Sequence, residues 1–273
     1  MAVRRELEKR GVVITGAAGG LGTALAERYA AAGARLALLD LDGARAEALA
    51  ARLRSQGAAA EAFGCDIADE ADCTTAIAAA QAALGGIDVL VNNAGISARV
   101  LLRDSTPAVA RRVMAVNYFG ALHATQAALP SLVERRGQIV VISSVAGFSP
   151  LVGRTAYAAS KHALHGFFDS LRAELRGAGV AVTIACPSFI ATGIAKAAQG
   201  ATQRVTGGDE AAPDAIAARI VDAALRGERL CLPGRTARLG WWVSRVAPAL
   251  YERLMLERVG GEFELIQAGS EGR

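Results

Sequence analysis

The chain has 273 residues, of which 52% are hydrophobic, and a formal net charge of +4. This length allows one large domain or two small ones, and the even spacing of the elements described below favours one, residues 1–273, with a sizeable core. The two signs of charge are interspersed, no basic cluster or aromatic ladder is present and no apolar run reaches membrane-spanning length, so nucleic-acid binding and a membrane span are not expected.

The cysteines and histidines show neither a disulfide pattern nor a metal-ligand pattern. No C-x-x-C pair occurs, and the histidines lack ligand spacing. The charged start of the chain is not typical of a secretory signal. We therefore expect reduced thiols, no metal site and a cytoplasmic protein. The residues concerned are Cys65, Cys73, Cys186, Cys231, His123, His162 and His165.

A glycine-rich turn lies between the first expected strand, residues 12–15, and the first expected helix, residues 20–32. The strand is an apolar run, and the helix has apolar residues at helical spacing. Glycines let the backbone approach a pyrophosphate, whose charge meets the positive end of the helix. A turn that only connects the two elements is the alternative.

The second expected strand, residues 35–40, ends in an acidic residue, Asp40. An acid roughly 20 residues after such a glycine turn binds the ribose of a dinucleotide. A carboxylate would accept from both ribose hydroxyls and would repel a 2′-phosphate by roughly 4 kcal/mol per charge pair. We therefore predict NAD in preference to NADP. Asp42 is better placed to cap the next helix, whereas Arg45 is able to swing toward a phosphate.

Strands and helices alternate through the rest of the chain, which predicts a doubly wound α/β sheet with helices on both faces. Asp69 and the pair Thr106 and Pro107 are helix-start signals. Pro130 is expected to end or kink its helix. Further strands are expected at residues 59–65, 87–91, 138–143, 180–186 and 229–232, and further helices at 69–84, from 107 toward 130, around 157–176 and at 213–226.

The segment TAYAASK places Tyr157 and Lys161 four residues apart. In a helix both side chains lie on one face and converge on one cleft. A neighbouring cation favours the phenolate and so lowers the phenol pKa toward a useful range. Ser144 follows an apolar run, so its hydroxyl is expected at the carboxyl end of a strand. A chance Tyr and Lys on a helix is the alternative for the pair alone.

These motifs occur together as TGAAGGLG at residues 15–22, NNAG at 92–95, Asn117, Ser144, and Tyr157 with Lys161. In order and spacing this combination resembles the short-chain dehydrogenase/reductase family, from about residue 12 to residue 192. The resemblance implies a single Rossmann domain with about seven parallel strands. It also implies hydride transfer between a nicotinamide and an alcohol or carbonyl, and assembly as a homodimer or homotetramer.

The resemblance assigns roles to four catalytic residues. Tyr157 is the acid/base, and Ser144 donates to the substrate oxygen. Lys161 lowers the pKa of Tyr157 and holds the nicotinamide ribose. Asn117 opens the helix backbone for a water that relays protons to Lys161; an Asn in its apolar context is costly unless hydrogen-bonded.

The resemblance also implies the residues that contact the cofactor. Asp66 meets the adenine edge, and Thr192 and the backbone of Ile190 hold the carboxamide. Ser188 stands where the family usually has glycine, which affects the pocket on the nicotinamide side. The expected cofactor-binding set is Gly16, Gly20, Leu21, Gly22, Asp40, Asp66, Ile67, Asn93, Ala94, Gly95, Tyr157, Lys161, Pro187, Ile190 and Thr192.

The side chains expected near the reacting atoms are mostly apolar, which suggests a hydrophobic alcohol or ketone, steroid-like, retinoid-like or aromatic. Two alternatives stay open: a non-catalytic dinucleotide-binding regulator, which fold alone does not exclude, and a reductase of 3-oxoacyl thioesters or sugars. Four chemically competent catalytic positions argue against the regulator. The expected substrate-binding set is Ser144, Val145, Leu151, Val152, Tyr157, Ser188 and Phe189.

Two segments after the catalytic region have other expected roles. Residues 193–212 are polar and glycine-containing, which predicts a substrate lid or a segment without function. The C-terminal extension, residues 240–260, contains a stretch, 241–259, that carries apolar residues on one helical face and is expected to pack on its own domain or a partner subunit. Its tryptophans and arginines also permit contact with a membrane surface. The apolar residues are Val243, Val246, Leu250 and Leu254; the arginines are Arg238, Arg245, Arg253 and Arg258.

Overall fold

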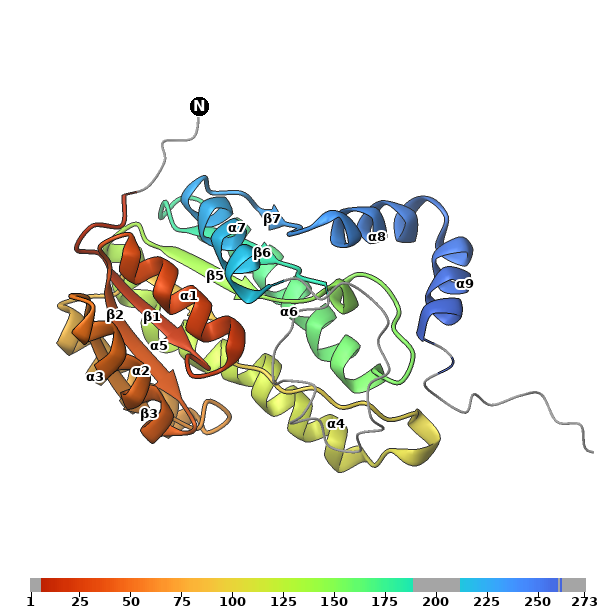
Figure 1. The fold of residues 1–273 in the computed structure, drawn as a ribbon, viewed down its shortest axis with the longest axis horizontal. Coiled ribbons are helices and arrows are strands. Elements are labelled where there is room, and N and C mark those ends of the chain that lie inside the picture. Colours follow the sequence, from red (N-terminus) through yellow and green to blue (C-terminus); the bar gives the residue numbers. More distant parts are fainter. Residues whose placement is uncertain (1–5, 189–211, 260, 262–273) are drawn as a thin grey trace, which may run out of the picture.

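The computed structural model describes residues 6–188, 212–259 and 261. In these ranges the strands form one parallel seven-stranded sheet in the order β3-β2-β1-β4-β5-β6-β7, with helices on both faces (Figure 1). The doubly wound α/β fold is confirmed. The strands are β1 (Gly11–Thr15), β2 (Arg35–Asp40), β3 (Ala59–Gly64), β4 (Val89–Asn92), β5 (Gln138–Ile142), β6 (Ala181–Ala185) and β7 (Leu230–Cys231).

The helices between and after these strands begin near the expected positions. Asp42 and Asp69 are confirmed as caps, because their side chains accept from Arg45 N and Asp72 N. Short elements are η1 (Leu102–Asp104), η2 (Ala115–Phe119) and η3 (Val145–Gly147). The α-helices are α1 (Gly20–Ala31), α2 (Gly43–Ser55), α3 (Glu70–Leu84), α4 (Pro107–Met114), α5 (Gly120–Glu134), α6 (Thr155–Glu174), α7 (Pro213–Leu225), α8 (Arg235–Val246) and α9 (Pro248–Val259).

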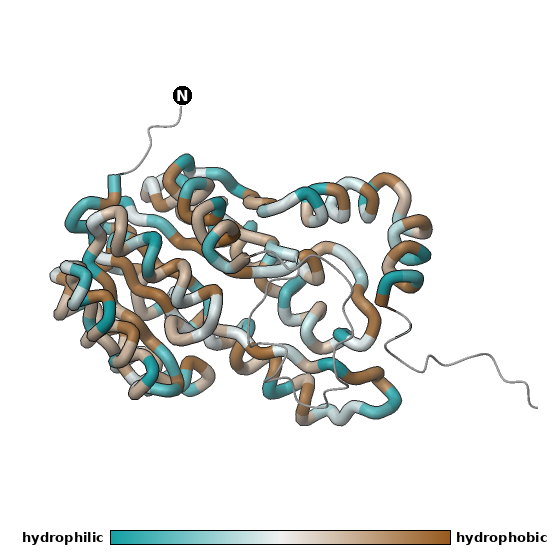
Figure 2. Tube along the Cα trace, viewed as in Figure 1, coloured by the Kyte–Doolittle hydropathy of each residue, from teal (hydrophilic) through white to brown (hydrophobic). Residues whose placement is uncertain are grey.

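The sheet is apolar on both faces because successive side chains of a strand point to opposite sides. Val12 and Ile14 pack in one buried cluster with α1, α2 and α7. Val13, between them, packs in a second cluster with α3, α5 and α6. Brown, apolar segments follow the strands in Figure 2. Truncation of one fully buried residue, such as Leu38→Ala, would cost about 2–5 kcal/mol.

The strand order reverses between β1 and β4, which opens a crevice at the carboxyl ends of these two strands. Thr15 fixes the two strand ends to each other. Its hydroxyl oxygen accepts from the N–H groups of Asn93 and Ala94, each at 3.1 Å. The Asn93 side chain donates back to the carbonyls of Thr15 and Gly16. The segment after β4 is therefore held against the glycine turn after β1.

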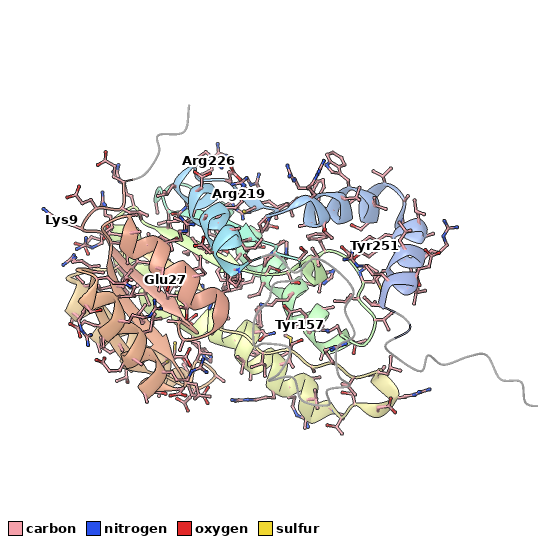
Figure 3. All side chains as sticks on the ribbon, in the orientation of Figure 1. Lys9, Glu27, Tyr157, Arg219, Arg226 and Tyr251 are labelled. Atoms are coloured by element: carbon pink, nitrogen blue, oxygen red, sulfur yellow. The ribbon has the colours of Figure 1, made fainter. Side chains whose placement is uncertain are left out.

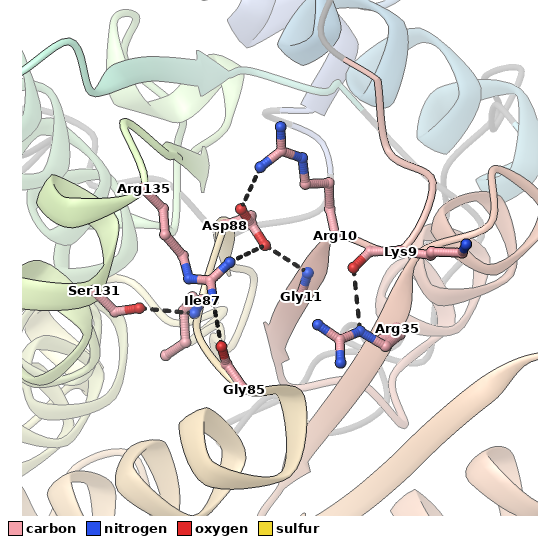
Figure 4. A network of polar contacts seen from close by, with 9 residues as sticks. All are labelled: Lys9, Arg10, Gly11, Arg35, Gly85, Ile87, Asp88, Ser131 and Arg135. Atoms are coloured by element: carbon pink, nitrogen blue, oxygen red, sulfur yellow. Dashed lines mark hydrogen bonds and ion pairs between the residues drawn. The ribbon is translucent and has the colours of Figure 1, made fainter.

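A buried carboxylate, Asp88, joins β1 and β4 at their opposite, amino ends (Figure 4). It accepts from Gly11 N at 2.8 Å and from Arg10 at 2.9 Å, with Arg135 at 3.4 Å. A buried charge is tolerated only when it is paired and hydrogen-bonded, as this one is. This network lies at the end of the sheet away from the crevice and supports the fold.

Two helices end at other residues than predicted. Of the two outcomes expected at Pro130, an end or a kink, the end does not occur, since α5 continues to Glu134. Proline has no N–H to donate to the carbonyl of Gln126, four residues earlier in the helix. Both residues are exposed, so water is able to form the missing hydrogen bond. The single helix expected at residues 241–259 is divided into α8 and α9. The break lies at Ala247, which has φ −141°. Ala247 precedes Pro248, and a residue before proline avoids the helical region.

Candidate active site

A cavity of about 790 Å³ opens at the carboxyl ends of the central strands. Most of the predicted site residues line it, from both sides of the crevice. Asn117 and Val152 do not line it, and Phe189, Ile190, Thr192 and most of the predicted lid lie outside the described residues. The predicted residues that line the cavity are Gly16, Gly20, Leu21, Gly22, Asp40, Asp66, Ile67, Asn93, Ala94, Gly95, Ser144, Val145, Leu151, Tyr157, Lys161, Pro187 and Ser188.

Two glycines of the glycine turn, Gly16 and Gly22, have no room for a side chain. Gly16 has φ +63°, and a Cβ there would lie 2.7 Å from the Cα of Ala94. A Cβ on Gly22 would lie 2.2 Å from the Gly16 carbonyl oxygen. Helix α1 starts directly behind, with no side-chain cap and no acidic residue in its first turn. The free N–H groups of that turn and the helix dipole make this end of the cavity suited to a diphosphate.

An acidic and a basic side chain, Asp40 and Arg45, lie together in the cavity wall near the glycine turn. The Asp40 carboxylate accepts from Ala18 N at 2.9 Å and from Asp42 N at 3.1 Å. The Arg45 guanidinium donates to the Ala18 carbonyl at 2.9 Å, so it is held beside Asp40. The backbone thus fixes the carboxylate where it is able to meet ribose hydroxyls, as a dinucleotide requires.

Asp66 and Ile67 form the neighbouring wall. One Asp66 oxygen accepts from Ala68 N at 3.0 Å, and the other lies 3.8 Å from Arg112. Ile67 packs against Gly120, where a Cβ would lie only 2.7 Å away. The turn after β3 is therefore rigid, and the Asp66 carboxylate keeps its place at the edge of the cavity.

The predicted opening of the helix around Asn117 is confirmed, since η2 is a π-helical turn between α4 and α5. The buried Asn117 side chain accepts from Ile96 N at 2.8 Å and donates to Ile96 O at 3.0 Å. It also donates to the Ser160 hydroxyl on α6 at 2.9 Å. Asn117 thus ties the segment after β4 to the helix that carries Tyr157, and it does so from behind the cavity wall.

Tyr157 comes from the first turn of α6 (Figure 3), and Lys161 follows one turn later. The Lys161 ammonium lies 5.6 Å from the centre of the Tyr157 ring and donates to the Ile142 carbonyl at 2.8 Å. Burial lowers the pKa of Lys161 to about 8. The predicted convergence of the two side chains on one cleft is confirmed.

The predicted pKa effect of Lys161 on Tyr157 is wrong for the protein alone. Burial of the phenol raises the pKa of Tyr157, and this effect outweighs the others. A hydrogen bond with Ser144 and the positive charge of Arg154 partly offset it. Lys161 shares its proton with a backbone carbonyl instead of facing the phenol closely. The Ser144 oxygen, in turn, accepts from Ala146 N at 3.2 Å.

Sequence reasoning missed several polar residues of the cavity wall. Arg154 is the N-cap of α6, lines the cavity and donates to the Ser97 side chain. Ser143 also lines it, and its hydroxyl lies 3.1 Å from Nε2 of His165. Burial lowers the pKa of His165 to about 4, so this imidazole is neutral near pH 7. The position of Arg154, one helical turn before Tyr157, was the available signal.

Across the described residues no group of His, Cys, Asp and Glu is arranged to hold a metal ion. Within the same ranges no helix has the length and apolar content to cross a bilayer.

One family of known proteins matches more than half of the chain. The family described as short chain dehydrogenase matches residues 10–203, which include the glycine turn and Tyr157. The chain belongs to the short-chain dehydrogenase/reductase family. Members of this family use NAD or NADP.

The relatives of this chain are matched over most of their own length. The mouse protein dehydrogenase/reductase SDR family member 7B is 38% identical over 264 residues, covering 92% of this chain and 81% of its own. 2-(S)-hydroxypropyl-CoM dehydrogenase 3 of Xanthobacter autotrophicus is 37% identical over 215 residues, covering 78% and 82%. A short chain dehydrogenase/reductase structure from Burkholderia phymatum in complex with NAD has a TM-score of 0.81 at 26% identity, covering 97% and 100%.

Ser188, which is expected in the place of a family glycine, lines the cavity next to Pro187. The Pro187 carbonyl accepts from Val145 N at 3.2 Å, so the segment after β6 is fixed to η3. The hydroxymethyl group of Ser188 therefore belongs to the cavity wall near Val145.

Proposed function

We propose that the protein is an NAD-dependent alcohol dehydrogenase or carbonyl reductase that acts on a hydrophobic secondary alcohol or ketone. The observation that carries this proposal is the meeting of Ser144, Tyr157 and Lys161 in one cavity with the glycine turn. A proton-exchanging group and an anion-binding helix end at opposite ends of one cavity are what hydride transfer from a dinucleotide requires.

The side chains handle the substrate oxygen. A bound nicotinamide would supply hydride exchange with the reacting carbon. Tyr157 would give its proton to the oxygen of a ketone or remove that of an alcohol. Ser144, which is hydrogen-bonded to the phenol, would donate to the same oxygen and stabilise developing negative charge.

Lys161 and Asn117 support this proton transfer. With a pKa of about 8, Lys161 is mostly protonated at pH 7 and gives up a proton more readily than an exposed lysine. Its charge and donors also suit the hydroxyls of a nicotinamide ribose. Asn117 would hold the segment after β4, through Ile96, and helix α6, through Ser160, at a fixed separation around Lys161.

The preference for NAD rests on Asp40. Its carboxylate lies in the cavity wall with both oxygens held by backbone N–H groups, so it has little freedom to turn away from a 2′-phosphate. Repulsion by a fixed charge exceeds that by a mobile one. Arg45 is occupied by the Ala18 carbonyl and favours NADP less than a free arginine would.

The apolar substrate class rests on Val145 and Leu151, which line the cavity beside Tyr157. Val152 does not contribute, because its neighbours Leu151 and Arg154 take the cavity-facing positions of this turn. A homodimeric or homotetrameric assembly and a cytoplasmic location complete the proposal.

The test is an assay of reduced-cofactor absorbance with NAD and NADP and a panel of hydrophobic secondary alcohols and ketones. 3-Oxoacyl thioesters and sugars belong in the same panel. We expect turnover with NAD and an apolar substrate, reduced by at least about 100-fold in Tyr157→Phe. Turnover of thioesters or sugars alone would mean that the substrate belongs to one of these classes and is not a hydrophobic alcohol or ketone. Saturable NAD binding without any turnover would favour a dinucleotide-binding regulator.

A further inference from the structure

Helix α8 exposes a row of large apolar side chains. Leu239 is 66% exposed, Trp242 62% and Val246 76%. Their spacing of three and four residues puts them on one face of the helix. The opposite face carries the buried Ala237. Figure 1 shows α8 and α9 as an extension beyond β7, at the edge of the molecule.

The charged residues of α8 are all arginines. Arg235 and Arg238 are exposed and border the apolar row, and the segment 233–251 contains no Asp or Glu. In the part of the chain that the structure describes, neither arginine forms an ion pair with an acidic side chain. Arg245 stacks on the Trp241 ring at 4.0 Å, which leaves Trp242 as the outward-facing indole. The face is therefore apolar in its centre and positively charged at its border.

We propose that this face of α8 binds the surface of an anionic lipid bilayer. A helix that lies in the interface has an apolar face for the acyl boundary and basic residues for the headgroups. Exposed tryptophan is suited to the same depth. With 12 residues, α8 is too short to span the bilayer and would lie parallel to its surface.

A second copy of the chain fits this face less well. Two copies joined through α8 would bring the arginines of both helices together, and α8 has no acidic side chain to pair with them. Helix α9, by contrast, carries both signs, with Arg253 paired to Glu257 at 3.7 Å. The charge pattern of α8 therefore favours lipid phosphates over a copy of itself.

The position of α8 also suits the proposed function, on which this one point rests. Helix α8 packs against η3, and Val145 of η3 lines the cavity. A bilayer at α8 would thus lie close to the cavity in which an apolar substrate is expected. Bilayer binding itself needs neither cofactor nor turnover, so it stands or falls independently of the enzymatic assignment.

Co-sedimentation of the full chain with lipid vesicles tests the proposal. We expect binding to vesicles that contain phosphatidylglycerol, weak binding to pure phosphatidylcholine, and release by salt. Arg235→Gln and Arg238→Gln should each weaken binding about fivefold, and Trp242→Ser about tenfold. Arg52→Gln, which removes the same charge from an ion pair with Glu27 on α1, is the matched control and should bind like wild type.

The outcomes separate lipid binding from its alternatives. Absence of wild-type binding to anionic vesicles would overturn the proposal, as would equal loss of binding in Arg52→Gln and Arg238→Gln. A dimer that Trp242→Ser dissociates, without vesicle binding by the wild type, would assign the face to a second copy. Circular dichroism of each variant verifies that the fold is retained. We expect this result because the side chains of Arg235, Arg238 and Trp242 are all exposed.

Discussion

The guanidinium of Arg154 lies 5.8 Å from the centre of the Tyr157 ring, at the first turn of α6. Its charge lowers the pKa of the phenol, against the larger effect of burial, which raises it. Arg154 therefore favours the phenolate of Tyr157, an effect that the sequence motifs assigned to Lys161.

For Arg154→Gln we expect the pH profile of kcat/KM for alcohol oxidation to shift to higher pH. The phenolate is the base in that direction, and removal of a nearby positive charge raises the phenol pKa. Arg154→Lys keeps a charge at the N-cap, so its pH profile should lie between those of the wild type and Arg154→Gln. An unshifted profile in Arg154→Gln, with normal folding, would show that Arg154 has no influence on the proton transfer.

Tyr157→Phe should reduce kcat by about 10²–10⁴-fold, the usual contribution of a positioned acid or base. The phenyl ring preserves the packing of α6, so the NAD dissociation constant, measured by calorimetry, should change less than threefold, well below about 1 kcal/mol. Comparable losses of turnover and NAD affinity would mean that Tyr157 acts mainly in cofactor binding.

Asp40→Asn should reduce the preference for NAD over NADP by on the order of tenfold or more, since it removes the charge that opposes a 2′-phosphate. The asparagine keeps one oxygen for the Ala18 N–H, which limits damage to the turn. Steady-state kcat/KM with both cofactors measures the ratio. Asp42→Asn, at the cap of α2, is the control and should leave the ratio unchanged.

Acid should destabilise the protein partly through His165. Its pKa of about 4 in the folded chain lies below the ordinary value of 6.5, because burial disfavours the charged ring and outweighs the attraction of Asp169. The unfolded chain therefore binds the proton first, and stability is lost as pH falls from about 6.5 toward 4. Urea unfolding at pH 7 and pH 5 should show a smaller loss for His165→Gln than for wild type. An equal loss would place the acid sensitivity elsewhere.

Local signals allowed much of the fold to be predicted. Caps such as Asp42 and Asp69 act through bonds to backbone three residues away, so they are visible in the sequence. The strands are continuous apolar runs because helices cover both faces of the sheet. The π-helical turn at Asn117 was expected from the family resemblance together with a polar residue in an apolar segment.

What failed depended on three-dimensional surroundings. The raised pKa of Tyr157 follows from burial of the phenol, which the spacing of the pair does not reveal. Arg154 reaches the cavity because it is the N-cap of α6, a position fixed by the preceding turn. Pro248 was a readable signal for the break between α8 and α9, but the continuous apolar pattern outweighed it in the prediction.

The two edges of the sheet affect how the protein behaves at high concentration. An edge strand offers unpaired backbone groups to other chains and is a starting point for aggregation. Strand β7 has only two residues, which leaves little to pair with. At the other edge, β3 carries the exposed Glu61 near its middle and ends at Gly64. Both edges therefore oppose growth of the sheet from one molecule to the next, which favours recovery of active protein from concentrated solution.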